Sequence, residues 1–283
     1  MHEKKRVVLV TGAAGGVGVA VTRLLIEKGV HVVALVRYES DLNVFVSEGL
    51  NIERGFVLDI QSEEEVDGFF EALKAACAAE WDFFGMVHCA GISYVSPMET
   101  LPLDELQSML NTNLVASVRL IQKAVPLLRQ SGGKIVVLGS VAGRVAGQLV
   151  GGYSASKFGL RAVVDAFRRE LAGTGIDVSL IEPGGIVTAM MDKETKFVRE
   201  RLKGLTVYEE EHYGDQYRKF EKMISGAKDF SSSPEKVAGR AVSLVTRPGK
   251  LRPYYRVGSD SKLITFLDWI LPMAVLDRIL VKL

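Results

Sequence analysis

Tyr153 and Lys157, four residues apart, are the first side chains in this sequence whose types and spacing could do chemistry. Residues at this spacing lie on one face of a helix, so the Lys157 ammonium can lie beside the Tyr153 phenol. A phenol has a pKa of about 10 and is a poor acid–base catalyst at neutral pH, but a nearby cation favours its ionised form. Ser140, at the end of the apolar run 134–140, adds a hydroxyl. A tyrosine and a lysine at this spacing are more often a surface pair, whereas the three groups together predict acid–base chemistry.

A glycine-rich segment follows the first apolar run, with glycines at Gly12, Gly16 and Gly18. Glycines at the start of a helix allow a tight turn, let a pyrophosphate approach the backbone, and leave free N–H groups to bind it. The spacing differs from the common GxGxxG fingerprint of dinucleotide-binding proteins. A glycine-rich turn without a ligand is the alternative, but the position after an N-terminal strand favours a dinucleotide site.

The elements that position these residues form a regular alternation. Apolar, β-branched runs alternate with helical patterns, which is typical of a parallel sheet buried on both faces. The expected strands are 6–11, 31–36, 51–59, 83–90, 134–140, 177–183 and 254–258. We therefore predict an α/β protein with a doubly wound, Rossmann-type and mostly parallel sheet of about seven strands, with helices on both faces.

The remaining chain fits the same single domain, 1–283. Residues 188–233 are charged and aromatic without a strand pattern, so we expect a helical flap over one end of the sheet. Its candidates for lining an apolar substrate site are Met190, Met191, Phe197, Leu202, Leu205, Val207 and Tyr208, although packing onto the domain would explain them equally well. The apolar tail 260–283 is too interrupted by charges and proline to span a membrane, which takes about 20 mostly apolar residues. It could be a membrane-surface helix, a lid or a subunit contact, and membrane binding is the less favoured of these.

Composition and charge exclude several classes of protein. The chain has 35 Lys and Arg against 34 Asp and Glu, so its net charge of +1 gives no overall attraction to nucleic acid. With 48% hydrophobic and 24% charged residues it is a packed globular protein. Its two cysteines, Cys77 and Cys89, cannot form a disulfide framework or a metal site. No secretory signal is visible, so we expect a cytoplasmic protein without a metal.

Taken together, these motifs resemble the short-chain dehydrogenase/reductase family in its single-domain branch, over nearly the whole chain. The step of 13 residues from Ser140 to Tyr153 is the family's spacing, and 111–117 matches the helix with its catalytic asparagine, here Asn113. The resemblance implies a dinucleotide cofactor bound by a wider set of residues. These are Gly12, Ala14, Gly15, Gly16, Val17, Gly18, Arg37, Asp59, Ile60, Ala90, Gly91, Tyr153, Lys157, Pro183, Gly184, Ile186 and Thr188.

The family's mechanism implies a role for each catalytic residue. Tyr153 would donate a proton in carbonyl reduction while Ser140 polarises the carbonyl oxygen. Lys157 would lower the pKa of Tyr153 and bind the nicotinamide ribose, and Asn113 would hold a relay water. The protein supplies orientation and electrostatics while the cofactor carries the hydride.

One segment departs from the family's pattern. The usual NNAG after the fourth strand is His88-Cys89-Ala90-Gly91 here. The small Ala90 and Gly91 that admit the cofactor remain, but two side-chain amides are missing. We interpret His88 as a structural imidazole that replaces amide hydrogen bonds, and Cys89 as a small buried residue without a chemical role.

The choice of cofactor depends on the end of the second strand. NAD enzymes prefer an acid there, which accepts hydrogen bonds from the ribose 2′-hydroxyl. This chain has Arg37, whose guanidinium suits a 2′-phosphate, so we expect NADP(H) rather than NAD(H). An exposed arginine without a ligand is the alternative.

The substrate is the least determined of these predictions. The segment 143–188 is most similar to the retinol and hydroxysteroid dehydrogenase group, which implies a hydrophobic alcohol and its ketone or aldehyde, of steroid, retinoid or long-chain type. A 3-oxoacyl reductase of lipid or polyketide synthesis is the second interpretation, with Arg144 and Lys193 as weak candidates for contacting a carrier phosphate. A non-catalytic NADP(H)-binding sensor or scaffold is the third. The resemblance also implies a homodimer or homotetramer that associates through the helices around Asn113 and Tyr153.

Overall fold

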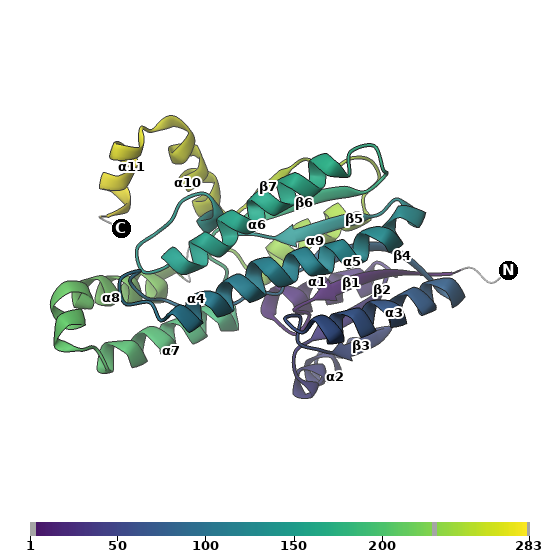
Figure 1. The fold of residues 1–283 in the computed structure, drawn as a ribbon, viewed down its shortest axis with the longest axis horizontal. Helices are drawn as coiled ribbons and strands as arrows, with labels where there is room; N and C mark the ends of the chain where they lie inside the picture. Colours follow the sequence, from purple (N-terminus) through teal and green to yellow (C-terminus); the bar gives the residue numbers. More distant parts are fainter. Residues whose placement is uncertain (1–3, 228–230, 282–283) are drawn as a thin grey trace.

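A single parallel sheet of seven strands forms the centre of the molecule in the computed structural model, which describes residues 4–227 and 231–281 (Figure 1). The strand order is β3-β2-β1-β4-β5-β6-β7, so the prediction of a doubly wound parallel sheet is confirmed. The strands are β1 (Lys5–Thr11), β2 (His31–Val36), β3 (Arg54–Val57), β4 (Trp81–His88), β5 (Lys134–Leu138), β6 (Asp177–Pro183) and β7 (Tyr254–Val257).

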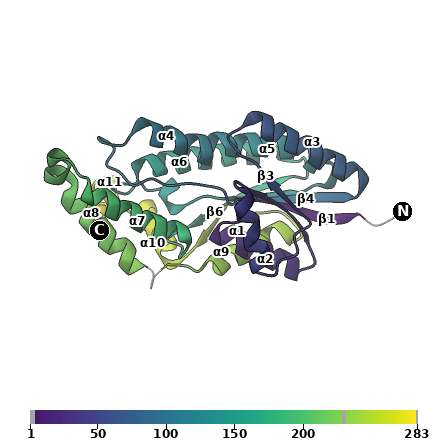
Figure 2. The same ribbon diagram turned by 90° about the horizontal axis from the view of Figure 1, so that it is seen from below.

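Helices cover both faces of this sheet, as Figure 2 shows edge-on. One face carries α3 (Glu63–Ala79), α4 (Leu103–Leu110), α5 (Ala116–Ser131) and α6 (Gly151–Glu170). The other carries α1 (Gly16–Glu27) and α9 (Pro234–Thr246). Short elements complete this part of the fold: η1 (Glu39–Leu42), α2 (Asn43–Ser47), a π-helical turn η2 (Asn111–Val115) and a 3₁₀ turn η3 (Val141–Gly143).

Two apolar cores, one on each face, hold the layers together. The strands bury side chains on both faces, as in β1, where Val7 and Leu9 join one core and Val8 and Val10 the other. All four of these side chains are fully buried. This two-sided burial explains the continuous apolar runs of the sequence, because a half-exposed strand would alternate apolar and polar residues.

The chain reverses its direction of winding between β1 and β4. It first adds strands outward from β1 to β3 and then from β4 to β7. The strands β1 and β4 are therefore neighbours in the sheet, although 69 residues lie between Thr11 and Trp81. Ligands of doubly wound sheets bind at the carboxyl ends of the strands, at such a switch point. The carboxyl end of β1 and the segment after β4 therefore define where a cofactor would lie.

Two helical additions extend from the same end of the sheet (Figure 1). The first is the pair α7 (Ala189–Lys203) and α8 (Val207–Ala227), which we call the flap, and the second is the pair α10 (Ser259–Ile270) and α11 (Met273–Leu280). Residues 228–230 of the predicted excursion 188–233, and residues 282–283 of the tail, lie outside the described residues. No helix in the described part of the chain is long and apolar enough to cross a membrane.

Candidate active site

The glycine segment packs directly on the backbone that follows β4. Gly12 has a positive φ of 61°, and a Cβ there would lie 2.7 Å from the main chain of Ala90. A Cβ on Gly18 would collide with the carbonyl oxygen of Gly12. Only glycine fits either place, so the backbone closes tightly where α1 begins.

The N-terminus of α1 is free to bind an anion. Its N-cap, Gly15, provides no side-chain hydrogen bond, and the first turn contains no acidic residue. Open N–H groups at a helix N-terminus favour a phosphate. The residues present therefore fit the pyrophosphate of a dinucleotide.

The loop 183–188 lies against this segment from the other side. A Cβ on Gly16 would lie 3.0 Å from Cγ2 of Thr188, so the loop and the start of α1 are in close proximity. Asp260 of α10 fixes the loop, because its carboxylate accepts a hydrogen bond of 2.7 Å from the N–H of Gly185. Thr188 thus lies beside the glycine segment, and Ile186 packs against the apolar core that contains Ala13 and Val17.

Ser140, Tyr153 and Lys157 meet at the carboxyl end of β5. The Ser140 hydroxyl is hydrogen-bonded to the Tyr153 phenol, and the Lys157 ammonium lies 5.6 Å from the centroid of the Tyr153 ring. Lys157 donates to the carbonyl oxygen of Leu138 at 3.2 Å, and its Nζ would lie 3.5 Å from a Cβ on Gly91. The three predicted groups therefore converge on the cofactor side of the sheet edge.

Burial controls the protonation of these groups. Desolvation raises the pKa of Tyr153 to about 12, against the lowering effect of its hydrogen bond with Ser140, and the charge of Glu194 raises it further. Desolvation also lowers the pKa of Lys157 to about 8. The sequence argument expected Lys157 to favour the phenolate, but in the protein alone desolvation outweighs that effect, and Tyr153 carries its proton at neutral pH.

Asn113 lies in the π-helical turn η2 and is fully buried. Its Oδ1 accepts a hydrogen bond of 2.8 Å from the N–H of Ile92, and its Nδ2 donates to the carbonyl oxygen of Ile92 at 2.8 Å and to Ser156 Oγ at 2.9 Å. The side chain therefore joins the segment after β4 to α6. A relay water would have to use the main-chain oxygen of Asn113.

His88 occupies the place where the family has an asparagine. It is buried between Thr11 Oγ1, 2.6 Å from Nδ1, and Ser117 Oγ, 2.7 Å from Nε2, and Ser117 in turn donates to the carbonyl oxygen of Asn113. Desolvation lowers the pKa of His88 to about 3, so the ring is neutral. The interpretation of His88 as a structural imidazole agrees with these bonds. Desolvation also raises the pKa of the Cys89 thiol to about 12, which makes it unreactive.

Arg37 and Asp59 meet at the outer end of the predicted cofactor site. The Arg37 guanidinium lies 3.4 Å from the carboxylate of Asp59, and both side chains are partly exposed. Asp59 Oδ1 also accepts a hydrogen bond from the N–H of Gln61. An anion that binds Arg37 would therefore compete with a weak, solvent-exposed ion pair.

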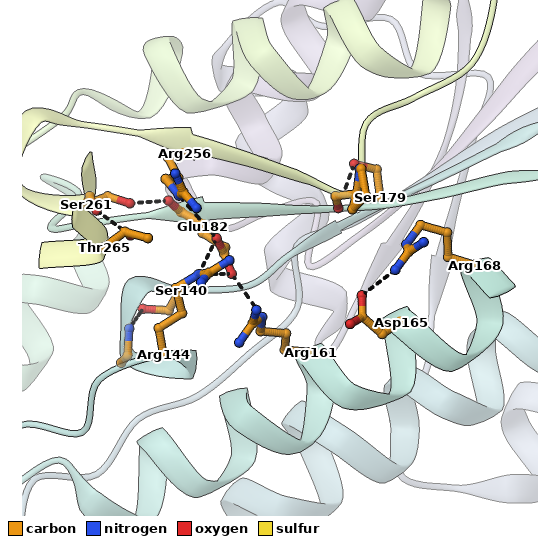
Figure 3. Close-up of polar contacts among 12 residues, drawn as sticks. Ser140, Arg144, Arg161, Asp165, Arg168, Ser179, Glu182, Arg256, Ser261 and Thr265 are labelled. Carbon is orange, nitrogen blue, oxygen red and sulfur yellow. Dashed lines mark hydrogen bonds and ion pairs between the residues drawn. The ribbon is translucent and has the colours of Figure 1, made fainter. Parts of the chain in front are cut away.

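A buried carboxylate, which the sequence argument did not identify, lies directly behind Ser140 (Figure 3). Glu182, at the end of β6, has a fully buried side chain, and both of its oxygens accept a hydrogen bond of 2.9 Å from Nε of Arg144. Arg161 and Arg256 approach it at 3.5 Å and 3.9 Å. Arg144 follows η3, the turn that Ser140 caps through a hydrogen bond from the N–H of Ala142. Glu182 thus ties β6, α6 and β7 to the turn that holds Ser140.

This arrangement corrects one expectation. Arg144 was a candidate for contacting a carrier phosphate, but its guanidinium is committed to Glu182 and only 12% of its side chain is exposed. An acid near the end of the run 177–183, which begins at a second acid, Asp177, was the only sequence signal for Glu182. Its three basic partners come from distant segments, so no local pattern could identify them.

The fold and the site together define a class of protein: a nucleotide-binding oxidoreductase of doubly wound topology with a serine, a tyrosine and a lysine at the sheet edge. The family profile described as short chain dehydrogenase matches residues 6–199. The chain therefore belongs to the short-chain dehydrogenase family.

Three known proteins illustrate the similarity. The NADPH-dependent 3-dehydrocapnine reductase of Ornithobacterium rhinotracheale is 30% identical over 283 residues, covering 98% of this chain and 96% of that protein. Human retinol dehydrogenase 16 is 30% identical over 290 residues, covering 99% and 89%. The crystal structure of a short-chain dehydrogenase from Streptomyces avermitilis has the same fold, with a TM-score of 0.76 at 22% identity over 98% of this chain and 97% of that chain. The predicted similarity to the retinol dehydrogenase group is confirmed.

We predict that Glu182→Gln lowers the free energy of unfolding by about 3–5 kcal/mol, because it leaves three guanidinium groups around a site without a negative charge. Chemical denaturation of the two proteins measures this loss. Glu71→Gln is the matched control, because its partner Lys74 lies 3.5 Å away and 75% of the Glu71 side chain is exposed. The control should change stability by at most about 1 kcal/mol. A loss in Glu182→Gln no larger than in the control would contradict this account of the cluster.

A second prediction concerns pH. His88 binds a proton near pH 6.5 in the unfolded chain but only near pH 3 in the folded protein. The unfolded state therefore binds more protons below pH 6.5, and stability falls as the pH falls. This single group should cost about 1.4 kcal/mol between about pH 7.5 and pH 5.5. His88→Asn, which restores the family's residue, should remove that part of the dependence in denaturation curves. Equal pH dependence in the two proteins would refute it.

Proposed function

We propose that this protein is an NADP(H)-dependent oxidoreductase that interconverts a hydrophobic alcohol and its ketone or aldehyde. The single observation that carries the proposal is the hydrogen bond between Ser140 and the Tyr153 phenol, with the Lys157 ammonium 5.6 Å from the same ring. These groups lie beside Gly91, whose neighbour Ala90 contacts the glycine segment. Acid–base groups are thereby next to a site that fits a dinucleotide.

The chain's own residues account for the proton and the orientation of the substrate. In reduction, Tyr153 donates its proton to the carbonyl oxygen, and Ser140 donates a hydrogen bond to the same oxygen as negative charge develops there. The high pKa of Tyr153 keeps this proton in place until the carbonyl becomes basic. Lys157 stabilises the resulting phenolate and assists its return to the protonated phenol. When bound, the nicotinamide supplies the hydride that the carbonyl carbon receives, so the product is the neutral alcohol.

Arg37 supports NADP(H) as the cofactor. Its guanidinium is partly exposed and lies at the carboxyl end of β2, where a 2′-phosphate on the adenosine ribose would be. The reductase of Ornithobacterium rhinotracheale, by its name, depends on NADPH. Asp59, which lies beside Arg37, is then our candidate for contact with the adenine.

The flap supports a hydrophobic substrate. Val95, Leu149, Val198 and Tyr217 form a small buried apolar cluster between the flap and the segments after β4 and β5, and Phe197, Leu202 and Leu205 pack against it. Val207 and Tyr208, which the sequence offered as further lining residues, are instead 87% and 49% exposed. A steroid, a retinoid or a long-chain compound would match this environment. One relative, human retinol dehydrogenase 16, is named for a retinoid.

A 3-oxoacyl reductase is a weaker second candidate. A carrier-bound substrate calls for basic residues at the rim of the site, and with Arg144 bound to Glu182 only the exposed Lys193 is left of the two candidates. The third interpretation, a sensor that binds NADP(H) without turnover, does not require the contact between Ser140 and Tyr153. The contact therefore favours an enzyme over a sensor.

We also propose a homo-oligomer that forms through the face of η2, α5 and α6. A hollow of about 500 Å³ on this face is lined by Leu114, Val115, Val118 and Val163 together with the polar side chains of Glu63, Arg119 and Gln122. Val115 is 48% exposed, and a second copy of the chain would bury it.

We predict that Tyr153→Phe lowers kcat at least about 100-fold, because general acid catalysis by a positioned side chain contributes about 10²–10⁴-fold. Reduced-nicotinamide fluorescence should show that the variant still binds NADPH. Tyr255→Phe is the control for loss of a phenol, since the hydroxyl of Tyr255 contacts only the N–H of Arg252 among the described residues. Substantial turnover by Tyr153→Phe would overturn the assignment.

We predict further that Arg37→Gln weakens NADPH binding by about 10- to 100-fold and changes NADH binding little, because a charge-assisted bond to phosphate contributes about 1.5–3 kcal/mol. Fluorescence titration with both cofactors measures the ratio. Arg23→Gln is the control, as a partly exposed arginine that pairs with Glu48. Tighter binding of NADH than NADPH by the unaltered protein would contradict the choice of cofactor.

A further inference from the structure

The helix α10 turns its polar side inward and its apolar side outward. A helix on a globular protein ordinarily does the opposite and packs its apolar stripe on the core. In α10 the buried residues are Ser261 and Thr265, which lie four apart on one face. Spacings of three and four residues place the exposed large apolar side chains in one stripe along the helix. This outer stripe consists of Leu263, Phe266, Trp269 and Ile270.

Hydrogen bonds hold the polar side of α10 against the body of the protein. The Asp260 carboxylate accepts a hydrogen bond of 2.7 Å from the N–H of Gly185, and the Ser261 hydroxyl donates one of 2.7 Å to the carbonyl oxygen of Glu182. Thr265 donates to the carbonyl oxygen of Ser261 at 2.6 Å. The outer stripe could turn over the active site only if the bonds to Gly185 and Glu182 broke, so these contacts argue against a lid.

The outer stripe lies on a part of the molecule that extends away from the sheet (Figure 1). Trp269 is 81% exposed, and its ring centroid lies 6.4 Å from that of Phe266. Pro272 then starts α11, where Met273 and Val275 are also exposed. Large apolar side chains gathered on one projecting surface indicate a binding partner that is itself apolar.

Size and charge favour a lipid surface over a second copy of the chain. A stable protein interface takes about 800 Å² and about 20–30 residues from each partner, whereas α10 has 12 residues and presents one face. A bilayer needs no matching surface, since each apolar side chain that enters it contributes on its own, and tryptophan is enriched at its boundary with water.

The charges of α10 allow the same approach. Within α10, which is described throughout, Lys262 is the one exposed charged residue, because Asp260 and Asp268 are partly buried. No exposed carboxylate of this helix therefore opposes the phosphate of a lipid headgroup. The sequence alone made membrane binding the less favoured use of the tail, because it does not show which side of the helix faces outward.

We propose that the outer stripe of α10 docks on the surface of a lipid bilayer, with its apolar side chains inserted between the headgroups. The inference goes beyond the proposed function and stands on the exposure and hydrogen bonds of α10. Because Asp260 and Ser261 tie α10 to the loop 183–188 and to the end of β6, docking brings the substrate side of the active site next to the lipid. A hydrophobic substrate dissolved in the bilayer then has a short path to the site, and this last consequence rests on the proposed function.

The two tryptophans let the unaltered protein report on docking. Trp269 is exposed, whereas Trp81 is buried at the start of β4. On titration with phosphatidylcholine vesicles, we expect the tryptophan emission to move to shorter wavelength and lipids brominated on their acyl chains to quench it. Trp269→Phe should still float with the vesicles but lose both the shift and the quenching, which assigns the signal to α10.

A double variant, Leu263→Gln with Phe266→Gln, keeps Trp269 as the reporter and removes part of the outer stripe. Its partitioning into phosphatidylcholine vesicles should fall about 10-fold for each substitution, because each takes an apolar side chain out of the lipid. Val46→Gln is the matched control, since Val46 is as exposed as Trp269 but belongs to α2, far from α10 (Figure 1). Unchanged NADPH binding checks that each variant is folded.

Three results would overturn the docking proposal. The first is an emission spectrum that vesicles do not change. The second is a shift that appears without vesicles and grows with protein concentration, which assigns the outer stripe to a second copy of the chain. The third is binding that requires phosphatidylglycerol in the vesicles and is lost in salt, which assigns it to basic residues elsewhere. The vesicle measurements use neither cofactor nor substrate, so docking and the proposed reaction can fail independently of each other.

Discussion

The carboxylate of Glu182 is the interaction on which the substrate side of the molecule depends. One fully buried negative charge faces three guanidinium groups from η3, α6 and β7, so elements far apart in the sequence share a single counter-charge. The main-chain oxygen of the same residue accepts a hydrogen bond of 2.7 Å from Ser261 at the start of α10. Loss of this carboxylate would leave Arg144, whose side chain is only 12% exposed, without its counter-charge in water-poor surroundings. The turn that carries Ser140 is thereby fixed in orientation.

The cofactor side is fixed by neutral bonds instead. Thr11, His88, Ser117 and Asn113 form a continuous series of buried hydrogen bonds from the end of β1 to η2. A neutral imidazole connects Thr11 to Ser117, and it does so without adding a charge near the expected pyrophosphate. The two sides meet at Tyr153, whose protonation reflects burial more than any single neighbour. Rigid polar networks on both sides leave the flap as the part of the site where apolar contacts dominate.

The sequence predicted features that depend on local order. The seven strands follow from runs of apolar residues, and the proximity of Tyr153 to Lys157 follows from helix geometry. The sequence also predicted a structural role for His88. The family's pattern has a side-chain amide at this position, and the imidazole must replace its hydrogen bonds. Glu182 was missed because its role comes from groups 21 to 74 residues away, namely Arg144, Arg161 and Arg256. Such contacts exist only once the sheet has assembled.

The π-helical turn at Asn111–Val115 has a consequence for how this site tolerates changes in chain length. A π turn accommodates one residue more than an α-helical turn over the same stretch. Deletion of a single residue there would restore a regular α-helical turn, while the helix on either side keeps its orientation. The widened turn that carries Asn113 toward Ile92 would be lost, although Ser117 would stay beside His88. The helix from α4 through α5 can accept many substitutions on its surface, but its length is as closely defined as the identity of any catalytic residue.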